Sequence, residues 1–529
     1  MSNKLNRAKN SRESVGREII GQIMEYLLAV TTAVICVAVP FYARDGYDQI
    51  GNAKFDIYKN IFRLGFVPLL ILAVLYGVFW MREKHKCKLS LTDGFVLTYL
   101  ACVFLAAFLG GFYQDALWGS YGWNMGLAAQ VSFVLLYLFF SRFGKYYRPV
   151  LFILCAVSAV VFFIGILHRV GVDPIGFYRG LSDGQMAQFL STMGQATWYA
   201  SYLVVVLPVG IGVFLFTKNR IWRIVSGSYM VIGFGSLVTQ NSDSAYFALA
   251  GFMLVFFWIC VEKGEDLRRF LAVCILFLAA GKIMYFLMQI KPNPELEYDF
   301  MTRLVLQSSF IWVLLGICLV LYVVLWKRKD KEYPVQMMLW ARKAVLVAVM
   351  FLIGGIVALI ILQAGGYLPD GIAQKLSAVS YFTWDNDWGN GRGRIWRFGI
   401  RIFREENLLH KLIGVGPDCL SSYVSAYYSE EAELFWGQKV LTNVHNEWLN
   451  MLITGGILGL VSYGGIFVTA VRRFLEAKSR DMLLVGIAAA VVSYMAYNFF
   501  CYQQVCCTPF VFILLGVGEY LYGKDRQDT

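Results

Sequence analysis

The sequence predicts an all-α integral membrane protein with about fourteen transmembrane helices and one long extracytoplasmic loop. Apolar residues make up 58% of the chain and charged residues only 16%, a balance far from that of a soluble domain. Runs of roughly 20 apolar residues, the length that crosses the hydrocarbon core, recur along the whole chain. Because backbone polar groups must be paired inside lipid, such uninterrupted runs indicate helices and not barrel strands.

Each predicted span is one apolar run bounded by polar or charged residues. We expect transmembrane helices near residues 23–43, 61–80, 93–112, 124–140, 149–168, 197–216, 222–239, 244–261, 270–290, 308–326, 342–363, 447–471, 482–500 and 505–522. The first eleven occupy residues 23–363 and the last three residues 447–522. The long loop spans residues 364–446, and two tails, 1–22 and 523–529, complete the chain.

The distribution of Lys and Arg orients the bundle. Basic residues cluster at alternate ends of the spans, for example at Lys84, Lys86 and Lys88, at Arg142, Lys145 and Arg148, at Lys327, Arg328, Lys329 and Lys331, and at Arg472, Arg473, Lys478 and Arg480. The positive-inside rule places those ends in the cytosol. Both tails are then cytosolic, and the loop 364–446 lies on the outer side.

The net charge of +12 therefore reflects mostly topology. It gives no reason to expect nucleic acid as a partner, and the sequence carries no aromatic-basic nucleic-acid motif. The eleven cysteines include no C-x-x-C pair, and most of them lie inside predicted spans. We therefore expect neither a metal site nor a disulfide framework.

The outer loop carries most of the groups suited to a charged substrate. Residues 394–403 have apolar residues at helical spacing, which predicts an amphipathic helix with Trp396, Ile400 and Phe403 on its apolar side. Such a helix is typical of a segment that rests on the membrane surface. Arg392 precedes it in a glycine-rich turn, where a guanidinium is well placed to bind a diphosphate through two oxygens.

Several further residues are candidates for function. His445 lies where the loop meets the next span, and its ordinary pKa near neutrality suits a general base. A lone histidine at such a junction is also often only packed against the interface. Asn446 is expected to cap the helix that begins at Glu447. Lys282 is an ammonium group within the span 270–290, so it is either functional or extends to the interface along its apolar stem.

Three motifs around this loop resemble a known family when they are taken together. They are Arg392-Gly393-Arg394-Ile395-Trp396, Leu412-Ile413-Gly414-Val415-Gly416-Pro417, and His445-Asn446-Glu447-Trp448-Leu449-Asn450 followed by Gly455-Gly456-Ile457-Leu458-Gly459-Leu460. Their order and spacing resemble the O-antigen ligase/polymerase superfamily. That family's pattern is an arginine four residues before a tryptophan, a G-x-G turn, and H-N-x-x-L leading into G-I-L-G. The segment 189–195 resembles a further family turn more loosely.

The resemblance implies an integral-membrane glycosyltransferase of the GT-C type that needs no metal or other cofactor. The implied donor is an undecaprenyl-diphosphate-linked glycan, and the implied acceptor is a second glycan. The enzyme would bind both at the outer face of the plasma membrane, in contact with membrane lipids. Carried over to this chain, Arg392 binds the diphosphate and His445 deprotonates the acceptor hydroxyl. Attack from the face opposite the leaving group inverts the anomeric centre.

One departure from the family pattern concerns a second cation. Many members carry an S-R-G-like turn that supplies another outward arginine, whereas the corresponding place here is Asn241-Ser242-Asp243-Ser244-Ala245. The candidates for the missing charge are Arg394, Arg303, Arg179 and Lys282, and the sequence does not choose among them. The candidates for supporting the base or the acceptor are Asp243, Asn446 and Glu447. Asp243 is equally suited to be no more than a polar turn residue.

These motifs predict a polymerase or ligase of surface polysaccharide and do not separate the two, because both use the same donor and differ in the acceptor. One alternative is a protein O-oligosaccharyltransferase, and another is a flippase that moves the lipid-linked glycan across the membrane. A flippase is expected to carry cations in a cavity along its spans, whereas this chain concentrates them in an outer loop. A third alternative is an interfacial scaffold without activity. The sugar repeat, the acceptor and the oligomeric state are left open.

Overall fold

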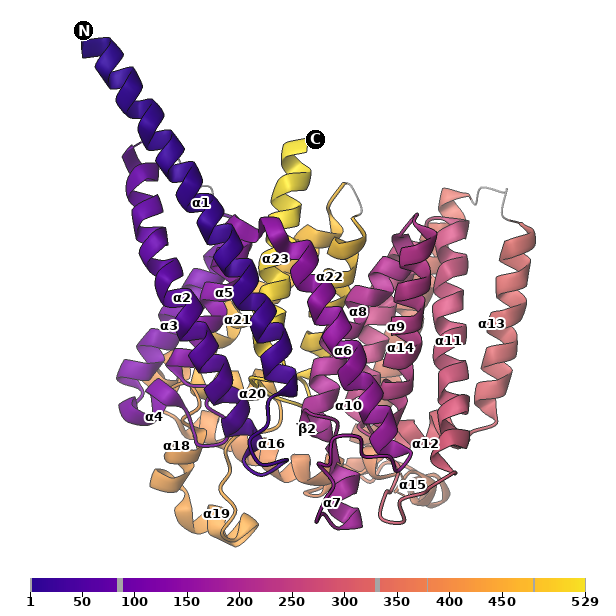
Figure 1. Cartoon of the computed structure of the whole chain (residues 1–529). Coiled ribbons are helices and arrows are strands. Elements are labelled where there is room, and N and C mark those ends of the chain that lie inside the picture. Colours follow the sequence, from indigo (N-terminus) through magenta and orange to yellow (C-terminus); the bar gives the residue numbers. More distant parts are fainter. Residues whose placement is uncertain (1, 83–88, 329–333, 378, 479–480, 529) are drawn as a thin grey trace.

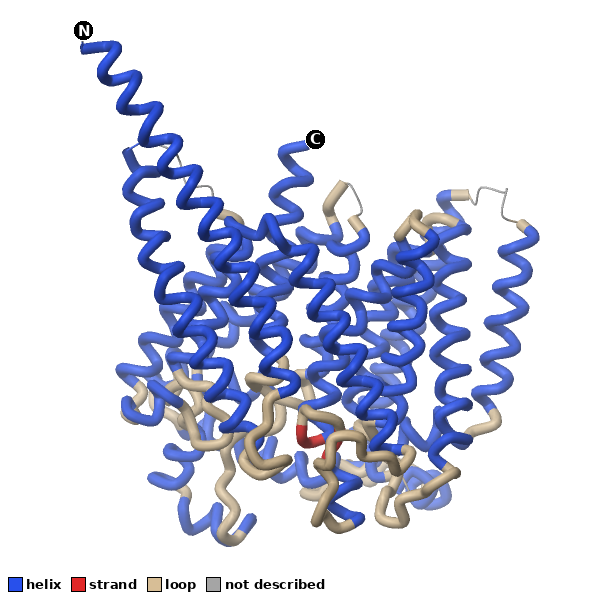
Figure 2. Tube along the Cα trace, in the orientation of Figure 1, coloured by secondary structure: helices blue, strands red, loops and turns tan. Residues whose placement is uncertain are grey.

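The computed structural model describes residues 2–82, 89–328, 334–377, 379–478 and 481–528. Of the basic residues that orient the chain, Lys84, Lys86, Lys88, Lys329, Lys331 and Arg480 lie outside these described residues. The chain forms a bundle of helices (Figure 1), in which both termini lie at one end and the segment 365–446 lies at the other. Helices dominate the described chain, and its strands form one short hairpin (Figure 2).

The long helices are α1 (Ser2–Phe41), α2 (Ile50–Arg82), α3 (Leu91–Leu109), α5 (Leu127–Phe143), α6 (Tyr147–Arg169), α8 (Ala196–Phe216), α9 (Arg220–Thr239), α10 (Asp243–Cys260), α11 (Gly264–Met288), α13 (Phe310–Lys327), α14 (Val335–Ala364), α21 (Gly456–Leu475), α22 (Met482–Tyr497) and α23 (Thr508–Asp528). The short connecting elements are α4 (Tyr113–Trp118), the 3-10 turn η1 (Gly144–Tyr146), α7 (Asp183–Gln188), β1 (Phe189–Leu190), β2 (Gly194–Gln195) and α12 (Phe300–Gln307). Between α14 and α21 lie α15 (Asp370–Ser377), η2 (Ser380–Phe382), α16 (Trp388–Glu405), α17 (Leu408–Ile413), α18 (Leu420–Tyr427), α19 (Ser429–Trp436) and α20 (Glu447–Thr454).

The all-α membrane fold is confirmed, but the count of fourteen spans is not. Eleven helices among the described residues are long and apolar enough to cross a membrane. The two spans predicted near 124–140 and 149–168 are present as α5 and α6, which η1 joins directly, so that Leu127–Arg169 counts as one of the eleven. Near 482–500 the helix α22 has only 16 residues. The last helix, α23, becomes polar from Glu519 onward.

Glycine motifs dock the segment 365–446 against the bundle. The backbone N–H groups of Val415 and Gly416 donate to carbonyls at the end of α20, at 3.1 and 3.0 Å. The predicted span 447–471 is broken there, and Gly456 has a φ of 68°. A Cβ on Gly414 would lie 2.2 Å from the backbone of Thr454, so this approach requires glycine. The contact fixes α20 and the residues just before it.

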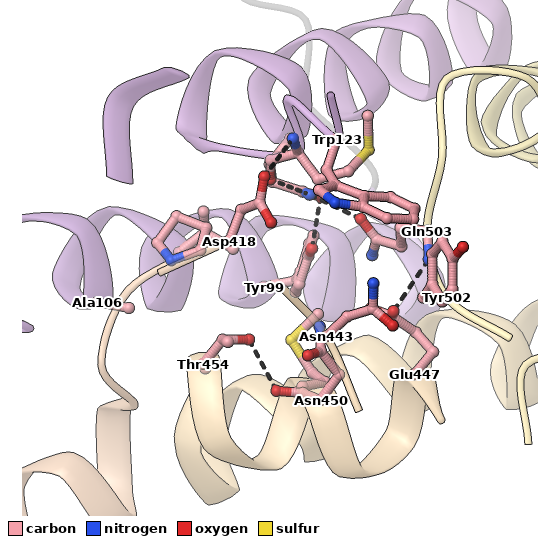
Figure 3. Close-up of a pocket in the computed structure, with 16 residues that line it drawn as sticks. Tyr99, Ala106, Trp123, Asp418, Asn443, Glu447, Asn450, Thr454, Tyr502 and Gln503 are labelled. Carbon is pink, nitrogen blue, oxygen red and sulfur yellow. Dashed lines mark hydrogen bonds between the residues drawn. The ribbon is translucent and has the colours of Figure 1, made fainter. Parts of the chain in front are cut away.

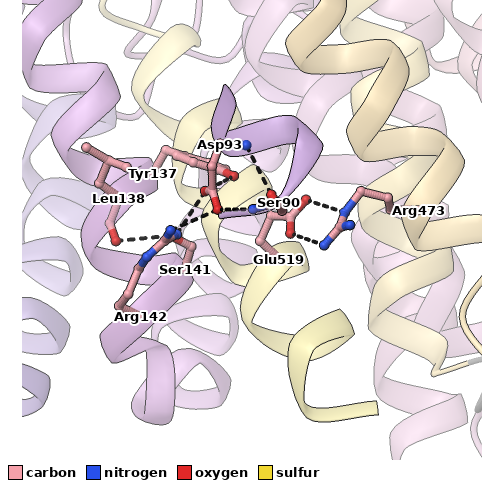
Figure 4. A network of polar contacts seen from close by, with 8 residues as sticks. All are labelled: Ser90, Asp93, Tyr137, Leu138, Ser141, Arg142, Arg473 and Glu519. Carbon is pink, nitrogen blue, oxygen red and sulfur yellow. Dashed lines mark hydrogen bonds and ion pairs between the residues drawn. The ribbon is translucent and has the colours of Figure 1, made fainter. Parts of the chain in front are cut away.

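At the end of the bundle that carries the termini, two arginines each form a bidentate ion pair with a carboxylate (Figure 4). Asp93 of α3 accepts from both terminal nitrogens of Arg142 on α5, at 2.9 and 2.8 Å. Glu519 of α23 accepts from Nε and Nη2 of Arg473 on α21, at 3.0 and 2.9 Å. Such bidentate pairs compensate carboxylates that are buried within a bundle. These ion pairs join four helices and are structural.

Candidate active site

A large groove runs between α10 and α14 toward the segment 365–446. Its volume is about 1420 Å³, at or beyond the upper end of the range for small-molecule sites. Apolar side chains of both helices line its long part, among them Phe247, Ala250, Leu254, Val349, Leu352, Ile356 and Ile360. The residues of α14 that line it recur at helical spacing on one stripe, and none of that helix's described residues is buried. The long part of the groove therefore suits an extended apolar chain.

Arg392 lies at the polar end of this groove and is the one basic residue among the described residues that line it. Gly389, Asn390 and Gly391 have φ values of 60°, 61° and 86°, so a left-handed turn makes the regular part of α16 begin at Arg392. The guanidinium donates from Nη1 to the Gly389 carbonyl at 2.8 Å. Its Nε is buried without a partner in the described part of the chain. A guanidinium beside a helix N-terminus favours the binding of an anion, because both carry positive charge.

Asp243 also lines this end of the groove and joins three elements. Its Oδ1 accepts the Met301 N–H of α12 at 2.9 Å, and its Oδ2 accepts the Tyr381 hydroxyl of η2 at 2.7 Å. Burial and the neighbouring Asp243 charge raise the pKa of Asp299 to about 6, while Arg392 opposes the shift. Asp243 therefore holds α10, α12 and η2 together at this end of the groove.

His445 lies near Arg392, just before α20. Burial, and then the Arg392 charge, lower the pKa of His445 to about 4, so the imidazole is neutral near pH 7. The residue has a φ of 51°, which is uncommon outside glycine, and its N–H donates to the Asn443 Oδ1 at 3.0 Å. Its ring packs edge-on against Tyr502, with centroids 5.1 Å apart. A neutral imidazole held beside a cation can accept a proton from a substrate hydroxyl.

Lys282 lies away from the groove lining. Its Nζ donates to the carbonyls of Leu306 and Ser308, both at 2.8 Å, at the end of α12. The ring of Trp312 lies 5.8 Å from the same ammonium group. Because the last carbonyls of a helix have no partners within the helix, a cation there satisfies them. These contacts describe a structural role for Lys282.

The other candidates for a second cation also lie outside the groove lining. Arg394 packs against the ring of Phe435 and donates to its carbonyl at 3.3 Å. Arg303 and Arg179 are exposed, and neither is among the groove-lining residues. In the described chain, the groove thus presents the guanidinium of Arg392 near the carboxyl groups of Asp243 and Asp299.

The two residues that follow His445 have different roles. Asn446 is the predicted helix cap, because its Oδ1 accepts the Leu449 N–H at 3.1 Å. Glu447 is buried, and its Oε2 accepts the backbone N–H of Gln503 at 3.0 Å. It lines a second, smaller cavity that has Tyr502 as one of its walls. Tyr502 therefore contacts the His445 ring and also lines the cavity that contains Glu447.

The helix predicted over residues 394–403 is present within α16, but it buries a different side. Phe398 and Ile402 enter a small core of the segment 365–446, whereas Ile400 is 41% exposed. Trp396 instead stacks on Phe500, with ring centroids 6.1 Å apart. The expected apolar side was wrong in part: Phe403 packs against the same core but Ile400 does not, because contacts with neighbouring elements such as α20 select the buried stripe.

Two tyrosines at the site escaped the sequence reasoning. Tyr381 lies in the irregular stretch between α15 and α16, where no periodic pattern marks it. Tyr502 follows α22, and the polar run of residues 502–504 between two apolar stretches was a signal that could have found it. Tyr502 lies more than fifty residues after His445 in the sequence, so only the folded chain shows their contact.

Among the described residues, no three His, Cys, Asp or Glu side chains lie close enough together to hold a metal ion. The fold and the site define a multi-pass membrane protein with a largely apolar groove that ends at the Arg392 guanidinium, and with a neutral imidazole near that guanidinium. Residues 300–464 match the family model described as O-antigen ligase, a range that includes the Arg392 turn, the glycine motif and His445. This match identifies an O-antigen ligase domain at residues 300–464, which supports the O-antigen ligase/polymerase superfamily and a membrane glycan-processing function of that type. No curated protein matches the chain.

Proposed function

We propose that the protein transfers a glycan from undecaprenyl diphosphate to a hydroxyl of a second glycan at the outer face of the plasma membrane. The groove carries this proposal, because its apolar part along α10 and α14 ends at Arg392. A polyprenyl chain would lie in the apolar part, with the diphosphate at the guanidinium. That order of apolar and cationic surfaces matches the order of groups in a lipid-linked diphosphate.

In the proposed reaction, His445 takes the proton from the acceptor hydroxyl as its oxygen attacks the anomeric carbon. The bond between that carbon and the diphosphate oxygen breaks, and its electron pair goes to the diphosphate. The Arg392 guanidinium and the start of α16 neutralise the added charge. Because the pKa of His445 is lowered to about 4, the imidazole enters the step unprotonated. Inversion at the anomeric carbon and independence from metal ions are part of the proposal.

The proposal covers a polymerase and a ligase, since the donor half of the site is the same for both. A polymerase would accept a second lipid-linked chain, whereas a ligase would accept a different surface glycan. Arg392 and His445 act on the donor diphosphate and on an acceptor hydroxyl in either case. The identity of the acceptor therefore has to come from an assay in which acceptors are supplied one at a time.

The test uses the full chain in lipid nanodiscs with undecaprenyl-diphosphate oligosaccharide, EDTA and no nucleotide sugar. For a polymerase, the expected result is release of undecaprenyl diphosphate together with longer lipid-linked chains. For a ligase, the expected result is release only when a glycan acceptor is added. A His445→Gln protein that elutes as a single folded species should release none. Glycan that appears on protein, or intact substrate that crosses a vesicle bilayer without release, would contradict the proposal.

A further inference from the structure

The second cavity lies between α3, α20 and the loop before α5, and polar and aromatic side chains line it (Figure 3). Its polar and aromatic walls include Trp123, Asp418, Asn443, Asn450, Tyr502 and Gln503. The centre of a water molecule can occupy about 40 Å³ of it. Because the walls stand back by a further water radius of about 1.4 Å, that space fits one small ring and not an extended chain.

Two amide side chains leave polar atoms unpaired at this cavity. Gln503 is only 5% exposed, and its Oε1 accepts from Gln130 at 2.7 Å, but its Nε2 is buried without a partner in the described chain. The Oδ1 of Asn450 is likewise buried and unpaired there. Unpaired buried donors and acceptors are rare in folded proteins. A donor and an acceptor that line one cavity fit a ligand that both accepts and donates, as a hydroxyl does.

Two carboxyl groups restrict the charge of such a ligand. The Oδ2 of Asp418 accepts the N–H groups of Ser120 and Met125 at 2.8 and 2.9 Å, which holds it in place. Burial raises the pKa of Asp418 to about 7, so near neutrality it is present both as a donor and as an acceptor. Glu447 lines the same cavity. No Lys, Arg or His lines the cavity among the described residues, so an anion there would lose its hydration without a cation to pair with, whereas a neutral polyol carries no such cost.

The aromatic walls connect this cavity to the proposed base. Tyr502 packs edge-on against Trp123, with ring centroids 4.7 Å apart, and against His445, with ring centroids 5.1 Å apart. Aromatic rings offer apolar faces to the C–H groups of a bound ligand while amides bind its polar edge. A ring seated against Tyr502 is therefore close to the imidazole and lies outside the groove that contains Arg392.

We propose that this cavity binds one neutral saccharide ring of the acceptor and excludes acidic sugars. The unpaired amide atoms of Asn450 and Gln503 bind its hydroxyl groups, and Trp123 and Tyr502 cover its apolar side. The role as an acceptor site rests on the proposed function. The preference for a neutral ring rests on the cavity alone, so the two can be tested separately.

The test measures binding of simple glycosides to the full chain in nanodiscs without any donor, by saturation-transfer NMR and by tryptophan fluorescence. The methyl glycosides of glucose, galactose and N-acetylglucosamine are compared with methyl glucuronide. At least one neutral glycoside should bind, and the glucuronide should bind about tenfold more weakly or not at all. Asn450→Ala should weaken the neutral glycoside about tenfold, the cost of one hydrogen bond to a ligand. Trp123→Phe should reduce the fluorescence response, and Asn60→Ala, at an exposed position of α2, should match the wild type.

Absence of binding by all three neutral glycosides would overturn the assignment. So would equal binding of the glucuronide, unchanged affinity in the folded Asn450→Ala protein, or an unchanged fluorescence response in the folded Trp123→Phe protein. Binding as expected without transfer from a polyprenyl-diphosphate donor would leave the cavity assignment in place and refute the proposed function. Transfer without glycoside binding would do the reverse. In a transferring enzyme, Asn450→Ala should raise the acceptor KM about tenfold and leave the donor KM unchanged.

Discussion

Acidification removes the proposed base by protonating His445, and the surroundings of the imidazole set the pH at which this happens. Burial and the Arg392 charge lower its pKa from 6.5 to about 4. At pH 5.5 such a group is about 97% neutral, whereas an ordinary histidine is about 9% neutral. Since kcat/KM follows the ionisation of the free enzyme, activity should stay nearly flat down to about pH 5. An unshifted histidine would cost about tenfold at pH 5.5.

The assay follows release of undecaprenyl diphosphate at donor concentrations far below KM, from pH 4.5 to pH 8. Circular dichroism at each pH shows whether the chain stays folded. Three groups near the site also titrate in this range, because the pKa values of Asp299, Asp418 and Glu447 are raised to about 6, about 7 and about 8. Asp299→Asn and Asp418→Asn proteins should therefore keep the acid limb of kcat/KM at the same pH as the wild type.

The reasoning would be refuted if kcat/KM fell about tenfold between pH 7.5 and pH 5.5 while the protein stayed folded. The same fall would have to occur in the Asp299→Asn and Asp418→Asn proteins. Such a fall would mean that the imidazole is solvated and far enough from Arg392 to titrate normally. The position next to Tyr502 would then not be the one that operates in catalysis.

Three further predictions concern the groove and its surroundings. Arg392→Lys should lower kcat/KM about ten- to a hundredfold, nearly as much as Arg392→Ala, because one ammonium group cannot replace a bidentate fork; full activity of the lysine protein would contradict this. Ala250→Trp should fill the groove and raise the donor KM, whereas Ala358→Trp on the outer side of α14 should match the wild type in the same steady-state assay. Lys282→Met should lower the thermal unfolding midpoint through a loss of about 1–3 kcal/mol, with a donor KM within about twofold of wild type; a large rise in KM at unchanged stability would restore a functional role.

Much of the fold was predictable because lipid imposes a simple requirement. A run of apolar residues long enough to cross hydrocarbon must be helical, and the all-α class follows directly. The number of spans did not follow, since it depends on where helices stop and join. The turn η1 joins α5 directly to α6, and the break at Gly456 is set by its contact with the glycine motif around Gly414. The contact at Gly456 is not local in the sequence.

The candidate site was predictable where its residues lie in short motifs. The spacing around Arg392 and His445 drew attention to both, and the structure places the two near each other. Lys282 was ambiguous because the carbonyls that it binds lie more than twenty residues further along the chain. The second cavity was not foreseen at all. Its walls come from segments as distant as Trp123, Asp418 and Gln503, which only the folded chain brings together.

The division of roles between Arg392 and His445 is tested most directly by donor affinity. The measurement is the Kd of a fluorescent polyprenyl diphosphate for full-length wild type, His445→Gln and Arg392→Ala in nanodiscs, alongside transfer by each. The expected result is that His445→Gln binds within about twofold of wild type and does not transfer. Arg392→Ala should bind at least about tenfold more weakly, the loss of one charge-assisted hydrogen bond or more. Unchanged binding by Arg392→Ala, or normal transfer by His445→Gln, would contradict the proposed site.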